Sequence, residues 1–497
     1  MNTTCTRTPN RTPALLSIGA LALALAGCAS QGDSRTHAVQ MDGSAVVSAA
    51  SLEGQALSPA AWPRVEWWQA YGDPQLDALM RTALAGQPSI RVAEARFRQA
   101  QAASGVARSA LFPQVGATAR STEQRFSENG PVSPTLAGEV DSINEINVGL
   151  SYELDLWGKN RAALEASLDR AHAAEVDAQA ARLVLTSAVA RTYLALDLAY
   201  AQRDIANAAL KQREQLLALT SRRVQAHLDS QVELTQAEAA LPVTRQEILA
   251  LTEVVTRLEN QLALLSGQGP DMGRSIQRPH LGPLPAATIP SNLPTELIGR
   301  RPDVVAARWR VEAASGDITV AKAQFYPNIS LNAFAGVQSV GLDNLMSIGS
   351  RMLGIGPAIS LPIFNGGRLR SALGVSQASY DIAVEQYNGT LVAAIHDVVE
   401  QLVVLRSLEQ QVKEQEAALA LSEKAWELAS ARYRHGLATY LQVLSAEGQV
   451  LAQRRLANAL KSRQAEGRMN LDRALGGGAL QNLAAPSVAH NTPSTNP

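Results

Sequence analysis

The fold is decided by Arg368–Gly436, which reads RLRSALGVSQASYDIAVEQYNGTLVAAIHDVVEQLVVLRSLEQQVKEQEAALALSEKAWELASARYRHG. The stretch has no proline, and apolar or aromatic residues recur in it every seven positions. These residues are Val384, Leu391, Val398, Leu405, Val412, Leu419, Trp426 and Tyr433. So long a heptad pattern predicts a coiled-coil seam, because an ideal helix drifts about 20° per heptad and must supercoil to keep its stripe on a partner. At about 1.5 Å per residue the helix would extend for about 100 Å, beyond any ordinary globular core.

The overall composition is typical of long helices with small contacts. The chain has 497 residues, of which 46% are hydrophobic but only 4% aromatic. Its net charge of −1 provides no basic surface, which argues against a nucleic-acid partner. Cys5 and Cys28 are the two cysteines, so the remaining chain has neither a disulfide framework nor a cysteine-based metal cluster.

Residues 1–27 are predicted to be a signal peptide. Arg7 and Arg11 precede a short apolar run with small flanking residues, which is typical of a signal rather than a spanning helix. Leu25-Ala-Gly-Cys28 resembles the bacterial lipobox, which predicts cleavage before Cys28 and acylation of this cysteine. An ordinary secretory signal with an incidental cysteine is the alternative. Residues 28–60 are expected to form a flexible tether, and no later apolar run is long enough for a transmembrane helix.

An internal repeat governs the rest of the chain. The matching segments are 88–96 with 302–310, 107–113 with 321–327, 155–161 with 362–368, and 227–234 with 436–443. We therefore expect one unit written twice, in the order helix, strand, strand, very long helix, helix. The expected domains are a first repeat at 61–266, a Pro- and Gly-rich linker at 267–294, a second repeat at 295–475 and a disordered tail at 476–497.

Strands are predicted where the apolar period changes from helical to two. The four segments are 115–126, 146–156, 329–337 and 353–363, each about long enough for a tilted strand to cross a bilayer. A half-buried sheet in a soluble protein is the alternative for any single strand. The linkers within the two strand pairs, 127–143 and 338–351, have the composition of outward loops.

The two long helical hairpins are expected to differ. The first comprises a long helix over 161–228, whose apolar residues recur every eleven positions, and a returning helix over 231–265. An eleven-residue period keeps one face without left-handed supercoiling. Pro242 lies within the returning helix and is expected to kink it, because proline lacks a backbone donor.

Four strands per chain predict oligomerisation. Even the smallest outer-membrane barrels have about 8 strands, and an open strand edge in lipid leaves backbone groups unsatisfied. Three chains would supply 12 strands and close a shared barrel, continued coaxially by the long helices around a common lumen.

The duplicated pattern resembles the TolC-type outer-membrane factors, and the lipobox resembles their NodT/OprM-like lipoprotein branch. Matching phrases include Arg301-Pro-Asp303, Ala321–Pro327, Leu361–Arg368 and Arg432–Gly436. The resemblance implies a mainly α fold with membrane strands, namely a trimeric, internally duplicated α/β-barrel with long periplasmic hairpins. It also implies a passive efflux duct, lipid-anchored in the outer membrane and extending into the periplasm. Its partners would be membrane lipid, a periplasmic adaptor and an inner-membrane pump of the resistance–nodulation–division type.

In that family the tips of the helical hairpins meet the adaptor and carry the constriction. The corresponding residues here are His227, Leu228, Asp229 and Ser230 at the first tip, and Arg434, His435, Gly436, Leu437 and Thr439 at the second. Gly436 suits a turn with positive φ, and the first tip has His227 at that place. Ser230 and Thr439 are placed to cap the returning helices. Asp229 is the nearest candidate for the acidic ring of several relatives.

Other roles remain open for several of these residues. The tip histidines could sense pH or metal, although contacts with helix-terminal carbonyls are the more ordinary role. Arg161 and Arg368, at matched strand-to-helix junctions, are expected to form ion pairs or to be solvated.

The chain is not expected to be an enzyme, to hold a metal or to need a cofactor besides the lipid on Cys28. It lacks the His-Glu-x-x-His, phosphate-loop and Gly-x-Ser-x-Gly motifs. Two alternatives to an efflux duct are an exit duct for type I protein secretion and a periplasmic coiled-coil scaffold without a pore. The strands that interrupt both repeats argue against the scaffold.

Overall fold

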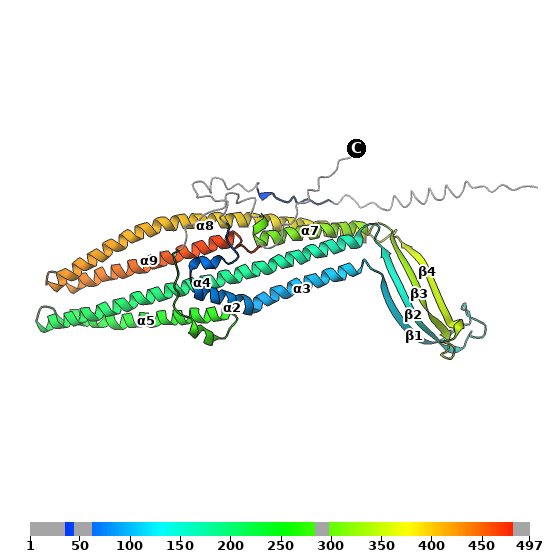
Figure 1. The fold of residues 1–497 in the computed structure, drawn as a ribbon, viewed down its shortest axis with the longest axis horizontal. Coiled ribbons are helices and arrows are strands. Elements are labelled where there is room, and N and C mark those ends of the chain that lie inside the picture. The colour runs from blue at the N-terminus through cyan, green and yellow to red at the C-terminus, as the bar shows by residue number, and fades with distance from the viewer. Residues whose placement is uncertain (1–34, 44–61, 284–297, 481–497) are drawn as a thin grey trace, which may run out of the picture. The chain divides into compact units, whose positions relative to one another are not determined.

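The computed structural model describes residues 35–43, 62–283 and 298–480. The predicted signal peptide and Cys28 lie outside these residues, as does most of the predicted tether. The described chain is mainly helical with one antiparallel sheet (Figure 1).

The duplication is visible in matched elements. Helices α3 and α7 have 22 residues each, α4 and α8 have 67 each, and α5 and α9 have 35 each. Their bounds are α3 Pro88–Ser109, α4 Lys159–Gln225, α5 Gln231–Leu265, α7 Pro302–Ala323, α8 Arg368–Arg434 and α9 Tyr440–Ala474. The predicted order and long hairpins are confirmed, and Pro242 lies within a continuous α5. Shorter elements are η3 Trp67–Tyr71, α2 Pro74–Gly86, η4 Pro270–Ser275 and η5 Ile348–Ser350.

The four predicted strands form one sheet in the order β1-β2-β3-β4, with every neighbouring pair antiparallel. Their bounds are β1 Gln114–Arg125, β2 Val140–Leu154, β3 Asn328–Val340 and β4 Arg351–Ser360. The second strand thus begins six residues before the predicted 146. Pairing of β2 with β3, from Ile143 opposite Val340 to Leu154 opposite Ile329, joins the strand pairs of the two repeats. Among the described strands, β1 and β4 pair on one side only, and every residue of β1 is exposed.

The chain forms two compact units. Of the described residues, one unit comprises 35–40, 98–173 and 308–387, and the other comprises 41–43, 62–97, 174–283, 298–307 and 388–480. In the first unit, Phe325, Leu369 and Leu373 pack together next to the sheet. In the second, buried Trp67, Trp68 and Tyr71 belong to the largest core cluster, which also contains residues of α4 and α9.

The heptad positions of α8 lie on a buried face, as predicted. Val384, Leu391 and Val398 are fully buried, and Leu405 and Tyr433 are nearly so. The intervening seam positions, residues 412, 419 and 426, are partly buried. One stripe of α8 therefore packs along most of its length, which accounts for a stable helix of 67 residues.

An 18-residue window of α4 is apolar enough to cross a membrane by length and composition, with a mean hydropathy of 1.2. This window departs from the expectation that no spanning candidate follows the signal. Because 56% of the window is buried within the fold, it is only weak evidence for a membrane span and also suits a core helix.

Two predicted flexible segments include folded parts. Within the tether, the backbone amides of His37 and Ala38 donate to Asp381 Oδ1, both at 3.0 Å, and the Met41 amide donates to Asn388 Oδ1 at 2.8 Å. The tail predicted from 476 begins with buried Gly476 and Gly477, so that boundary falls inside the folded part. Residues 481–497 lie outside the described residues.

The close pairing of β2 and β3 depends on Gly336. A Cβ at this position would lie 2.3 Å from the carbonyl oxygen of Ile146. We predict that Gly336→Ala destabilises the folded protein by about 1–3 kcal/mol, because the paired backbone must shift. Thermal unfolding in detergent measures this change. Gly356→Ala is the matched control, since a Cβ there meets nothing within 4 Å; equal effects of both variants would contradict the role of close β2–β3 pairing.

Asp472 makes stability depend on pH. Its carboxylate lies 3.5 Å from Arg468 Nε, and burial outweighs this cation and raises the pKa of Asp472 from 3.8 to about 6. A raised folded pKa stabilises the protein below the unfolded pKa, and this contribution is lost as pH rises through about 6. We predict that Asp472→Asn reduces the loss of stability between pH 4 and 7, by an amount on the order of 3 kcal/mol.

Thermal midpoints measured across this pH range test the assignment. The control is Asp271→Asn, because the Asp271 side chain is 95% exposed. Asp169, whose pKa burial also raises to about 6, leaves a residual slope in both variants. If the pH profile of Asp472→Asn matches that of the unsubstituted protein, Asp472 does not contribute to the pH dependence of stability.

Candidate functional site

The two hairpin tips have the same backbone turn. At the first, the amide of His227 donates to Val224 O and that of Leu228 to Arg223 O; at the second, Gly436 donates to Tyr433 O and Leu437 to Arg432 O. This is the Schellman arrangement, whose C′ residue has a left-handed backbone. Gly436 has φ 72°, and His227 has φ 63°, which makes it the one non-glycine residue with positive φ in the described chain. The first tip thus holds a histidine in a conformation that favours glycine.

Both returning helices begin at the predicted caps. Ser230 Oγ accepts from the amide of Val232 at 3.2 Å, and the amide of Ser230 donates to the Glu233 carboxylate at 2.9 Å. Thr439 is the N-cap of α9, and its amide donates to Gln442 Oε1 at 3.4 Å. These capping boxes fix where each hairpin reverses.

The outermost tip residues face away from the fold. Leu228 is 66% exposed and Leu437, at the same place in the second turn, is 69% exposed. His227, Arg434 and His435 are also exposed. The tips therefore carry a matched pair of apolar side chains beside groups that can hydrogen-bond.

Asp229 points back toward the second hairpin and forms a cluster with Thr220, Arg223 and Tyr433, which we call the tip cluster. Arg223 Nε and Nη2 donate to the two Asp229 oxygens at 2.8 and 3.0 Å, and the Tyr433 hydroxyl donates to Asp229 Oδ2 at 2.7 Å. Tyr433 Oη also lies 3.0 Å from Thr220 Oγ1. Arg223 Nη1 donates to the Tyr433 carbonyl at 3.2 Å, and its guanidinium lies 4.7 Å from the Tyr433 ring centre. The cluster thus joins the α4–α5 tip to α8.

The protonation states suit this cluster. The hydrogen bonds from Arg223 lower the pKa of the Asp229 carboxyl below its ordinary value, although burial opposes them. Burial raises the pKa of Tyr433 to about 12, so the phenol keeps the proton that it donates. The predicted candidate for an acidic ring is therefore engaged within its own chain. No role at the tips was predicted from the sequence for Arg223 or Thr220, and Tyr433 was predicted only as a residue of the α8 heptad seam.

A buried ion pair connects the hairpins farther from the tips. Arg213 Nε lies 3.3 Å from Glu447 Oε1, and Arg213 Nη1 donates to Thr244 Oγ1 at 2.7 Å. The Arg213 and Glu447 side chains are only 16% and 4% exposed. Removing one partner would leave a buried unpaired charge, so this contact resists separation of α4 from α9.

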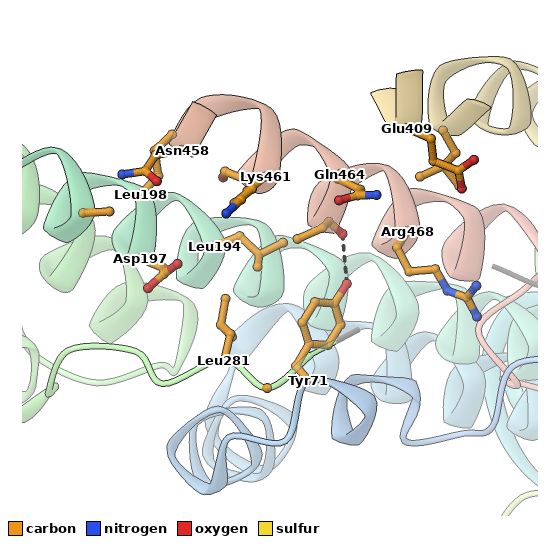
Figure 2. Close-up of a pocket in the computed structure, with 15 residues that line it drawn as sticks. Tyr71, Leu194, Asp197, Leu198, Leu281, Glu409, Asn458, Lys461, Gln464 and Arg468 are labelled. Atoms are coloured by element: carbon orange, nitrogen blue, oxygen red, sulfur yellow. Dashed lines mark hydrogen bonds between the residues drawn. The ribbon is translucent and has the colours of Figure 1, made fainter. Parts of the chain in front are cut away.

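A cavity of about 450 Å³ lies in the second unit, lined by parts of α4, α8 and α9, Tyr71 and residues 281–282 (Figure 2). The Tyr71 hydroxyl donates to the carbonyl of Ala465 at 3.1 Å. The charged residues that line this cavity are Asp197, Glu409, Lys461 and Arg468, two of each sign. The contact of Tyr71 fixes the N-terminal η3 segment to α9.

The matched strand-to-helix junctions differ. Arg161 forms the predicted ion pair, with Nε 3.3 Å from Asp155 Oδ2, and its Nη2 donates to Asp155 O at 3.0 Å. Although burial opposes them, the backbone amides of Arg161 and Asn160 and the Arg161 guanidinium together lower the pKa of Asp155. Arg368 is exposed and has no ion pair among the residues that the structure describes, which agrees with the second alternative, a solvated side chain.

In the described residues no three His, Cys, Asp or Glu side chains form a group that could hold a metal ion. His227 and His435 belong to separate turns. The tips thus combine hydrogen-bonded contacts between helices with exposed side chains.

Comparison with known proteins identifies the family. Residues 79–268 and 293–477 match the family model described as outer membrane efflux protein. The chain is 42% identical over 367 residues to the fusaric acid resistance protein FusA of Burkholderia cepacia, covering 73% of this chain and 69% of that protein. It is 31% identical over 440 residues to the multidrug resistance outer membrane protein MdtP of Shigella flexneri, covering 87% and 89% of the two chains.

Solved structures agree with this assignment. The outer membrane protein VceC of Vibrio cholerae has a TM-score of 0.79 and 38% identity, covering 84% of this chain and all of that one. The outer-membrane channel OprN has a TM-score of 0.79 and 26% identity, covering 91% of this chain and all of that one. The chain therefore belongs to the outer membrane efflux protein family, and it is an outer-membrane efflux channel with the TolC-like fold rather than an enzyme.

Proposed function

We propose that three copies of this chain form one duct through the outer membrane. The observation that carries this proposal is the four-stranded sheet with unpaired outer edges at β1 and β4. In hydrocarbon, unpaired backbone groups cost several kcal/mol each, so the edges must find partners. Pairing β4 of each copy with β1 of the next closes a ring, and three copies give it 12 strands, within the range of outer-membrane barrels.

Four aromatic residues support the membrane position of the sheet. Phe112 and Tyr326 precede β1 and β3, while Trp157 and Phe364 follow β2 and β4. All four are at least 38% exposed, and Phe364 is 91% exposed. Aromatic side chains gather where hydrocarbon meets water. We assign the periplasmic boundary of the bilayer to this girdle.

The opposite ends of the long helices serve as the docking end. Leu228 and Leu437 offer exposed apolar contacts beside His227, Arg434 and His435, which suits an amphipathic helical hairpin as partner. A periplasmic adaptor would supply that hairpin and connect the duct to an inner-membrane pump of the resistance–nodulation–division type. Relatives are named for fusaric acid resistance and multidrug resistance, so we assign small organic molecules as cargo, driven by the pump.

The tip cluster acts as a latch in this proposal. It joins the first tip to α8 through Arg223, Asp229 and Tyr433. The tips can move apart only if these hydrogen bonds break. Breaking them leaves the polar groups of Arg223, Asp229 and Tyr433 partly buried without partners, which costs free energy. Docking of the adaptor would supply the replacement contacts.

Lipidation of Cys28 would anchor each copy to the same membrane. The backbone of His37, nine residues after Cys28, is held at Asp381, thirteen residues after the start of α8. Nine extended residues reach about 30 Å, whereas thirteen helical residues span about 20 Å. An acyl chain on Cys28 is therefore within reach of the girdle.

Extraction in mild detergent without heating tests the duct. We predict a mass near three chains, because the unpaired strand edges need partners. The denatured sample should have an intact mass equal to the chain from Cys28 with added acyl groups, and Cys28→Ser should abolish this addition. A monomer with an intact sheet would refute the shared barrel, whereas an unmodified N-terminus would refute only the lipid anchor.

Loosening the latch tests the role of the tips. We predict that Asp229→Asn raises single-channel conductance in planar bilayers several-fold, because the neutral amide weakens the pairing with Arg223 by about 1.5–3 kcal/mol. Asp271→Asn, at an exposed position far along the sequence from either tip, is the control. Unchanged conductance of Asp229→Asn in intact trimers would show that the tip cluster does not restrict the opening.

A further inference from the structure

The two junctions between strand and long helix have the same basic residue with different surroundings. Residues 155–161 match residues 362–368, which places Asp155 opposite Pro362 and Arg161 opposite Arg368. In the first repeat the Asp155 carboxylate lies 3.3 Å from Arg161 Nε. In the second repeat Pro362 stands where Asp155 stands in the first. Arg368 therefore lacks the carboxylate that pairs with Arg161.

The surroundings of Arg368 offer no substitute. Among the described residues, its guanidinium has no ion-pair partner, and it is exposed. The nearby carboxylates are already engaged, Glu153 with Lys159 at 2.5 Å and Asp155 with Arg161. One positive charge therefore remains uncompensated at this junction.

Arg368 lines a cavity of about 390 Å³ within the first unit. Other lining residues are Trp157, Asn160, Tyr326, Asn328 and Ser360. The Trp157 and Tyr326 rings stack with centres 4.8 Å apart, and Trp157 Nε1 donates to the carbonyl of Pro327 at 2.8 Å. The cavity thus has a rigid aromatic wall, amide and hydroxyl groups, the paired charges of Glu153 and Lys159, the Asp155 carboxylate that is paired with Arg161, and the one guanidinium of Arg368 that has no such partner.

Exposed apolar side chains surround the same junction. Ile363 is 73% exposed, Phe364 is 91% exposed and Leu156 is 58% exposed. These apolar side chains add no binding free energy for a small hydrated anion. The acyl chains of a lipid can cover them and remove their apolar surface from water. Guanidinium groups bind phosphate oxygens with paired, charge-assisted hydrogen bonds.

We propose that Arg368 and this cavity bind the phosphodiester headgroup of a phospholipid in the periplasmic leaflet. The inference rests on the proposed membrane position of the sheet. The headgroup phosphate pairs with Arg368, Asn328 and Ser360 supply further hydrogen bonds, and the acyl chains lie along the exposed apolar residues. Each copy would carry one such site, which is lined by residues of both repeats and contains the arginine of the second.

Native mass spectrometry of the full-length protein, purified in detergent and titrated with short-chain phosphatidylglycerol, tests this site. We expect Arg368→Gln to weaken phosphatidylglycerol binding about tenfold, the effect of losing one charge-assisted contact. The double variant Asp155→Asn/Arg161→Gln is the matched control and should leave the affinity unchanged, because it removes both members of the ion pair at the first junction and frees no charge in the cavity. Diacylglycerol with the same acyl chains should bind weakly and equally to all three proteins.

Three results would overturn the proposal. These are equal effects of Arg368→Gln and of the control double variant, equal binding of diacylglycerol and phosphatidylglycerol, and displacement of the lipid by millimolar inorganic phosphate, which would indicate a small-anion site. The same spectra report the number of chains in the lipid-free assembly. A trimer without Arg368-dependent lipid would therefore refute this site alone, whereas a monomer would refute the shared barrel.

Discussion

A strand edge cannot remain unpaired in hydrocarbon, and this constraint organises the whole chain. Each repeat contributes one strand pair, which has two edges. Pairing of β2 with β3 removes one edge from each pair within the chain, and the edges at β1 and β4 must be satisfied by other copies. The long helices are continuous with this arrangement, because α4 and α8 begin within a few residues of the ends of β2 and β4. A requirement on the strands thus also fixes where the long helices begin.

Most of the fold was predictable because its signals are periodic. The seven-residue apolar repeat of α8 and the alternation in the strands follow from local geometry, and the internal repeat transferred each assignment to the other copy. The start of β2 was predicted at residue 146 rather than at Val140, because residues 140–145 are mostly polar and resemble the loop before them. The contacts of His37 with Asp381 and the burial of Gly476 depend on residues far away in the sequence, so no local pattern reveals them.

The sequence predicted where the hairpin tips lie, but it did not predict which side chains contact one another there. The turn residues and caps could be named because glycine, serine and threonine have specific backbone roles. Asp229 was selected for its charge, whereas the structure pairs it with Arg223 and Tyr433, whose side chains come from two different helices. Such a cluster depends on the relative rotation of α4 and α8, which their sequences do not encode locally.

The pairing of β2 with β3 also has a kinetic consequence. It brings Ile146 opposite Val337, two residues separated by the entire first helical hairpin, so the sheet has a high contact order. Until the second strand pair is available, the first pair has no partner and both of its edges are unpaired. Such edges are prone to aggregation. The first strand pair is therefore the part of this fold most exposed to aggregation until the second pair joins it.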